Sequence, residues 1–163
     1  MKTILSILIL AFVFNSCKKE ESINNFFLNL GVGITVKDKT GMDLLNLSNR
    51  GAYLESDIKI FYLSNGVKEE VYYANYDYPR NFYFSEEAES DGNFWMTLFL
   101  NSSSDEAYPI TYIKWSENDT DTLKCDVYRN EGLLTVKNIW LNDSLVWKWE
   151  DSRKGPRTIE IIK

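Results

Sequence analysis

The sequence predicts an all-β protein: a single antiparallel β-sandwich of about 8–10 strands, with a barrel-like arrangement as the alternative. Runs rich in β-branched and aromatic residues recur along the chain, separated by short groups of Gly, Pro, Asn, Asp and Ser. The 3.6-residue period of an amphipathic helix is almost absent. Residues 31–163 are enough for one domain with its own core and too few for two domains of ordinary size.

Strands are predicted where apolar and polar residues alternate, or where β-branched and aromatic residues cluster. The strongest local signal is Asn65-Gly66 between two such runs, because both central residues of a tight hairpin turn need positive φ. Asn142-Asp143 predicts a second tight turn. In chain order, the predicted strands are 32–36, 57–63, 67–73, 81–85, 94–101, 111–116, 122–128, 133–141, 145–149 and 158–162.

Residues 42–56 lack a strand pattern and predict a long irregular loop. Two apolar pairs, Leu44-Leu45 and Tyr53-Leu54, are expected to hold this loop against the core.

The N-terminal residues predict export. A basic start is followed by a mainly apolar run over 4–14 and by a small residue, Ser16, directly before Cys17. The run is shorter than the roughly 20 residues that a membrane-spanning helix needs. We therefore divide the chain into a lipoprotein signal peptide (1–16), a tether that starts at a lipidated Cys17 (17–30) and a β-rich globular domain (31–163).

The segment Phe14-Asn15-Ser16-Cys17 resembles a bacterial lipobox, and Lys18-Lys19-Glu20-Glu21 follows it directly. Together they resemble the start of Bacteroidetes-type surface lipoproteins, in which a lysine and acidic segment after the cysteine directs export to the outer face of the outer membrane. The resemblance implies that Cys17 is acylated and that the protein is lipid-anchored in the outer membrane and exposed at the cell surface. Acyl chains bind a bilayer by burying methylene groups.

The pattern downstream of the first strand resembles small lipoproteins of the same bacterial group, a family that carries no assigned activity. It consists of the run 38–46, then Gly51-Ala52-Tyr53 and then 57–60. A strand, an Asp-x-x-Gly turn and a following Leu are also similar to the start of transthyretin-like surface domains. Neither resemblance implies a catalytic residue.

Composition excludes several classes of function. The formal net charge is −6 and no basic stripe interrupts the acidic residues, so nucleic acid is not expected as a partner. The chain has no histidine, which excludes Ser-His-Asp and Cys-His catalysis and most zinc and iron sites. With Cys17 lipidated, Cys125 has no partner for an intramolecular disulfide. Cys125 alternates with Leu123 and Val127, so its side chain is expected in the core.

Aromatic residues make up 15% of the chain, and they are the most suggestive compositional feature for binding. The segment 72–80 is loop-like and too poor in aliphatic residues to lie wholly in the core, so a binding surface is sought there first. Tyr and Trp rings stack on sugar rings through their apolar faces while their polar atoms stay hydrated. The candidate binding residues are therefore Tyr72, Tyr73, Tyr76 and Tyr78, together with Trp140, which falls opposite Ile139 and Leu141 in its strand.

The alternative interpretation places the aromatic residues in the core, as is common in small β domains. Trp147 and Trp149 share one predicted strand face with Leu145, which indicates a buried stripe. Trp95 and Trp115 are interpreted in the same way.

Two classes of function stay open. The first is a non-catalytic binding or accessory protein that binds a glycan or an envelope-protein partner, and a purely structural coat protein is indistinguishable from it by sequence. The second is a histidine-free hydrolase that acts on glycans through paired carboxylates. Residues 117–121 could offer oxygen ligands to calcium, but they lack the spacing of an EF-hand loop. No catalytic residue, cofactor or metal site is therefore predicted.

Overall fold

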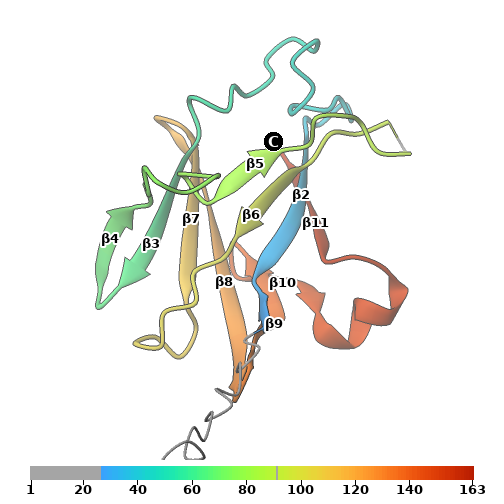
Figure 1. Cartoon of the computed structure of the whole chain (residues 1–163). Coiled ribbons are helices and arrows are strands. Elements are labelled where there is room, and N and C mark those ends of the chain that lie inside the picture. Colours follow the sequence, from blue (N-terminus) through green and yellow to red (C-terminus); the bar gives the residue numbers. More distant parts are fainter. Residues whose placement is uncertain (1–26, 91) are drawn as a thin grey trace, which may run out of the picture.

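The computed structural model describes residues 27–90 and 92–163. The predicted signal peptide, Cys17 and most of the predicted tether lie outside these residues. Across the described part, the chain forms eleven strands and a short 3-10 helix, and Figure 1 shows them as two layers, with β2, β5 and β6 in front of β7 and β8. The elements are β1 Phe27–Asn29, β2 Gly31–Lys37, β3 Lys59–Ser64, β4 Val67–Glu70, β5 Phe82–Phe84, β6 Met96–Phe99, β7 Ile110–Ser116, β8 Asp119–Asn130, β9 Leu133–Leu141, β10 Ser144–Lys148, η1 Trp149–Lys154 and β11 Thr158–Ile162.

The larger layer is a seven-stranded sheet in the order β1-β9-β8-β7-β3-β4, with β10 paired to β9. The smaller layer is a four-stranded sheet in the order β11-β2-β6-β5. The all-β prediction is confirmed, and neither sheet closes into a barrel. Two strand pairs, β1 with β9 and β11 with β2, are parallel and differ from the antiparallel prediction. Parallel neighbours need long connections, which leave no turn signal between them in the sequence.

Both sheets direct alternate side chains into one shared core, which is the arrangement of a sandwich. In β2, for example, Ile34 and Val36 are fully buried while the residues between them are half-buried. Cys125 lies in β8 with no exposed surface, as its alternation with Leu123 predicted. The loop over 42–56 is held to this core by Leu44, Leu45 and Tyr53, whereas Leu54 is exposed.

Both predicted tight turns are present. Asn65 and Gly66 between β3 and β4 have φ of 49° and 77°, and Asn142 and Asp143 between β9 and β10 have φ of 46° and 67°. These are the left-handed values that the primed hairpin turns require. The hairpin therefore fixes the register in which Ser64 pairs with Val67.

The predicted buried stripe of Leu145, Trp147 and Trp149 is wrong in two of its three members. Trp147 is 7% exposed, but Leu145 and Trp149 are 44% and 45% exposed. A shift of register between Leu145 and Trp147 interrupts the alternation of β10, because a bulge places successive side chains out of the two-residue period. Trp149 then begins η1 instead of continuing the strand.

The start of the domain also differs from the prediction, because β1 lies within the predicted tether of 17–30. Phe27 and Leu28 are exposed, and β1 is held through backbone pairing with Leu133–Thr135 of β9. Such a strand has no buried face, so the alternation of burial that indicates a strand is missing. Among the described residues, no helix has the length and apolar character needed to cross a membrane.

Candidate functional site

The loop that joins β4 to β5 displays all four tyrosines of the predicted binding segment. Backbone bonds from Tyr73 N to Pro79 O (2.7 Å) and from Tyr76 N to Tyr73 O (3.0 Å) fold the loop back on itself. These bonds satisfy backbone groups of the loop locally. Tyr72, Tyr73, Tyr76 and Tyr78 are 62%, 43%, 63% and 42% exposed. All four candidate residues therefore present their rings at the surface, which the sequence left open.

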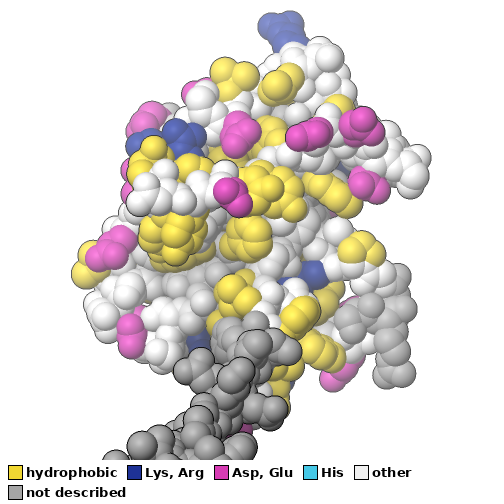
Figure 2. All heavy atoms as spheres, viewed as in Figure 1, with side chains coloured by type: hydrophobic (Ala, Val, Ile, Leu, Met, Phe, Trp, Pro, Cys, Tyr) yellow, Lys and Arg dark blue, Asp and Glu magenta, His cyan; other side chains and the backbone are white. Residues whose placement is uncertain are grey.

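The rings are ordered by contacts with each other and with the outer face of the four-stranded sheet. The centroids of Tyr73 and Tyr76 are 5.0 Å apart, and Tyr78 stacks on Tyr83 at 4.3 Å. Tyr83 and Phe99 project outward because their strand neighbours Phe82 and Leu98 are buried. Figure 2 shows the hydrophobic side chains that gather over β5 and β6 on this face.

Beside these rings is a cavity of about 670 Å³, which we call the tyrosine hollow. Tyr73, Tyr76 and Tyr78 line it together with polar side chains, among them Asn75, Asp77 and Asn81. A hollow of this volume, with apolar rings and a few hydrogen-bonding groups, has the usual character of a small-ligand site.

The inner wall of the tyrosine hollow is fixed by Tyr62 of β3. Its hydroxyl donates to Phe99 O at 2.7 Å and accepts from Asn81 Nδ2 at 3.0 Å. Burial raises the pKa of Tyr62 to about 12, so this hydroxyl stays protonated. These bonds join β3 of the larger sheet to β6 of the smaller sheet and hold the inner wall of the tyrosine hollow in place.

Trp140 does not join the four tyrosines. It projects from β9 on the outer face of the seven-stranded sheet, because its neighbour Ile139 is buried in the core. Its ring lies 5.8 Å from the ring of Tyr108, and Lys124 Nζ lies 5.5 Å from its centroid. The tyrosine hollow opens beside the other sheet, so the predicted five-residue set comprises two separate surfaces.

A second cavity on the smaller sheet, which we call the tryptophan hollow, was missed by the sequence interpretation. It has a volume of about 520 Å³ and is lined by Trp95, Trp147 and Trp149 with Arg157. Gly31 and Gly33 of β2 also line it. A glycine inside a strand often marks the place where another group approaches the backbone, and this was the available signal.

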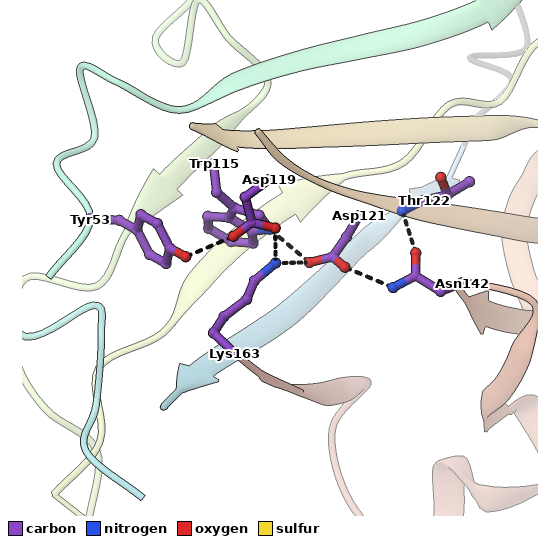
Figure 3. A network of polar contacts seen from close by, with 7 residues as sticks. All are labelled: Tyr53, Trp115, Asp119, Asp121, Thr122, Asn142 and Lys163. Atoms are coloured by element: carbon purple, nitrogen blue, oxygen red, sulfur yellow. Dashed lines mark hydrogen bonds and ion pairs between the residues drawn. The ribbon is translucent and has the colours of Figure 1, made fainter. Parts of the chain in front are cut away.

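A third candidate is a polar network that contains two carboxylates, drawn in Figure 3. Lys163 Nζ lies 2.6 Å from Asp119 Oδ1 and 2.6 Å from Asp121 Oδ2. Tyr53 donates to Asp119 Oδ2 at 2.9 Å, and Trp115 Nε1 donates to Asp121 Oδ2 at 2.8 Å. Asp121 is buried, and its other oxygen accepts from Asn142 Nδ2 at 2.7 Å.

The network holds two carboxylates and one ammonium, and both carboxylates contact that ammonium. Burial acts to raise the pKa of Asp121, but the bonds from Lys163, Asn142 and Trp115 outweigh it, and the pKa is lowered. A carboxylate held in its ionised form by a lysine is a poor general acid. Two of the three acids in residues 117–121, Asp119 and Asp121, are thus bound to Lys163, and the third, Glu117, pairs with Lys114 at 2.9 Å. No group of three or more candidate metal ligands occurs among the described residues.

Cys125 is enclosed in the core instead of lining either hollow. Its Sγ lies 3.4 Å from Asn101 O and 3.6 Å from Pro109 O. Burial raises the pKa of the thiol to about 12, which keeps it protonated and weakly nucleophilic.

No protein-family model, no curated protein and no solved structure matches the chain.

Proposed function

We propose that the protein is a lipid-anchored lipoprotein, exposed on the outer membrane through acylated Cys17, that binds a glycan in the tyrosine hollow without catalysing a reaction. The observation that carries this proposal is the ordered group of exposed rings, Tyr73, Tyr76 and Tyr78, on the border of a 670 Å³ cavity. Exposed large aromatic side chains in one place are unusual for a surface that only contacts water.

The chemistry of the tyrosine hollow supports a sugar as the occupant. Sugar rings offer an apolar face of C–H groups for stacking and a rim of hydroxyls for hydrogen bonds. Asn75, Asp77 and Asn81 offer donors and acceptors for such hydroxyls beside the rings. The hydrolase alternative has weaker support, because the Asp119 and Asp121 carboxylates are ion-paired with Lys163.

We predict that replacing Tyr76 and Tyr73 together with alanine weakens oligosaccharide binding at least tenfold, because truncating a well-placed aromatic contact removes about 1–3 kcal/mol. A panel of neutral and acidic oligosaccharides, titrated by calorimetry and by intrinsic fluorescence, measures the effect. Tyr108→Ala is the matched control, since Tyr108 is 53% exposed but lies next to Trp140. Silence of wild-type protein across the whole panel would refute glycan binding and favour an envelope-protein partner.

The anchor has a test of its own. We predict that Cys17→Ser removes the acyl group, so that the protein no longer partitions with membranes, while the folded domain is unaffected because burial of acyl methylenes is the only attachment proposed. Metabolic labelling with a fatty-acid analogue and membrane fractionation measure this. Unchanged labelling of the Cys17→Ser protein would contradict the lipobox interpretation.

A further inference from the structure

Arg157, which lines the tryptophan hollow, is held by the fold entirely through neutral acceptors. Nη1 donates to Gly31 O at 2.8 Å and to Asn29 O and Asn29 Oδ1 at 3.2 Å and 3.1 Å. Nη2 reaches Thr135 Oγ1 and Val136 O only at 3.4 Å and 3.5 Å. The guanidinium therefore crosslinks β2 and β9 without meeting a carboxylate.

The positive charge of Arg157 has no counter-charge among the described residues. Its Nε is enclosed and has no hydrogen-bond partner there, and no ion pair of the described residues includes it. A partly buried cation without an anion is costly. Lys163 shows the contrast, since its sheltered ammonium contacts two carboxylates at 2.6 Å.

The surroundings of Arg157 combine this charge with aromatic walls. Its guanidinium carbon lies 4.8 Å from the centroid of buried Trp147, which fixes the plane of the group. Trp149 is 45% exposed and lines the same hollow with Trp95. Gly31 has no side chain to occupy this space. A Cβ atom at this position would lie 3.8 Å from Thr97 Cγ2 and 3.9 Å from Phe99 Cε1, which are ordinary van der Waals distances.

The tryptophan hollow also adjoins the proposed glycan site. Gly31, which lines the tryptophan hollow, pairs directly with Phe99, which lines the tyrosine hollow. Both hollows therefore lie on the outer face of the four-stranded sheet, one strand apart. Strands in a sheet are about 4.8 Å apart, so one extended oligosaccharide can contact both.

We propose that the tryptophan hollow binds a uronic acid unit of the glycan, with the sugar ring against Trp149 and its carboxylate at Arg157. This inference rests on the proposed function and adds the substrate class, an acidic glycan. A carboxylate is the natural partner, because it supplies the missing negative charge and its oxygen is a strong acceptor for Nη2, whose contacts with Thr135 Oγ1 and Val136 O are long. Neutral sugars would leave the charge of Arg157 uncompensated.

The test compares short oligosaccharides of galacturonic, glucuronic and mannuronic acids with their carboxyl-reduced neutral counterparts, which differ only at the carboxylate. We expect wild-type protein to bind at least one acidic oligosaccharide ten or more times more tightly than its reduced form, with a preference that shrinks as salt is raised. Arg157→Gln should abolish the preference, while Lys148→Gln, a charge control on an exposed strand residue, should retain it.

Two further variants keep the proposal testable if Arg157→Gln fails to fold. Gly31→Leu fills the hollow from a strand position with room for a side chain, so it should abolish the preference in a folded protein. Trp149→Ala removes an exposed wall, so it should weaken binding of the acidic oligosaccharide. Equal binding of acidic and reduced forms, or a preference that survives Gly31→Leu, overturns the inference and leaves glycan binding intact. Absence of binding to every oligosaccharide overturns both.

Discussion

Replacing Lys163 with methionine is expected to lower the free energy of unfolding by about 3–5 kcal/mol, the range measured when one partner of a buried ion pair is removed. The reason is that Asp121, which is 6% exposed, would keep its charge without the ammonium that now lies 2.6 Å away. Trp115 and Asn142 would still donate to its oxygens, but they carry no charge. Urea unfolding at neutral pH measures the loss.

A matched surface pair separates burial from charge in this prediction. Lys59 Nζ lies 3.1 Å from Glu70 Oε2, with both side chains more than two-fifths exposed. Lys59→Met should therefore change stability by less than about 1 kcal/mol. The double change of Lys163→Met with Asp121→Asn should recover part of the loss. Equal small effects of Lys163→Met and Lys59→Met would show that Asp121 is solvated in solution.

The pH dependence of the same variant has a definite sign. Because the pKa of Asp121 is lowered in the folded protein, the unfolded chain takes up the proton first, near the ordinary aspartate pKa of about 3.9. The wild type therefore loses this contribution as pH falls through the lowered folded value. Without Lys163, burial favours the protonated form of Asp121. The loss in free energy of unfolding caused by Lys163→Met therefore becomes smaller as the pH falls. The stability difference between wild type and variant should therefore begin to shrink above about pH 4, the ordinary aspartate range, and continue to shrink as pH falls further.

The parts of the fold that were predictable are those encoded by local pattern. Asn65-Gly66 fixes a hairpin through the φ values of its own residues, and the alternation around Cys125 places that thiol in the core. In both cases the physical cause lies within a few residues of the pattern. The tyrosine loop was predictable only in part, because its lack of aliphatic residues indicated that it is not wholly buried but did not show which rings are exposed.

The features that could not be predicted depend on contacts between distant residues or on one local irregularity. Arg157 reaches Asn29, 128 positions away in sequence, and Lys163 reaches Asp119, 44 positions away. Neither pairing leaves a periodic signal. The bulge in β10 separates Leu145 from the face of Trp147, and the start of η1 moves Trp149 from the predicted core stripe to the wall of a hollow. In a strand rich in aromatic residues, the sequence alone does not show which rings face the core, because that depends on the register of the strand.

Replacing Trp115 with alanine is expected to lower the free energy of unfolding by about 3–5 kcal/mol, as for other large-to-small changes of fully buried aromatic residues. Trp115 is 1% exposed, and its ring lies 5.1 Å from that of Tyr53. Trp115→Phe should be milder, at about 1–3 kcal/mol, because it retains most of the ring and removes the Nε1 donor to Asp121. Urea unfolding of both variants measures the difference.

The two large predictions are not independent, and their coupling is the sharper test of the network. Trp115 Nε1 and Lys163 Nζ bind the same oxygen of Asp121, at 2.8 Å and 2.6 Å. Once Lys163→Met has removed the ammonium, Asp121 depends more on the remaining donor, so Trp115→Phe should cost more in that background than in the wild type. Additive effects in this double-mutant cycle would mean that the two donors stabilise Asp121 separately. Trp140→Phe, in a ring contact with Tyr108 on the other sheet face, should be additive with Lys163→Met.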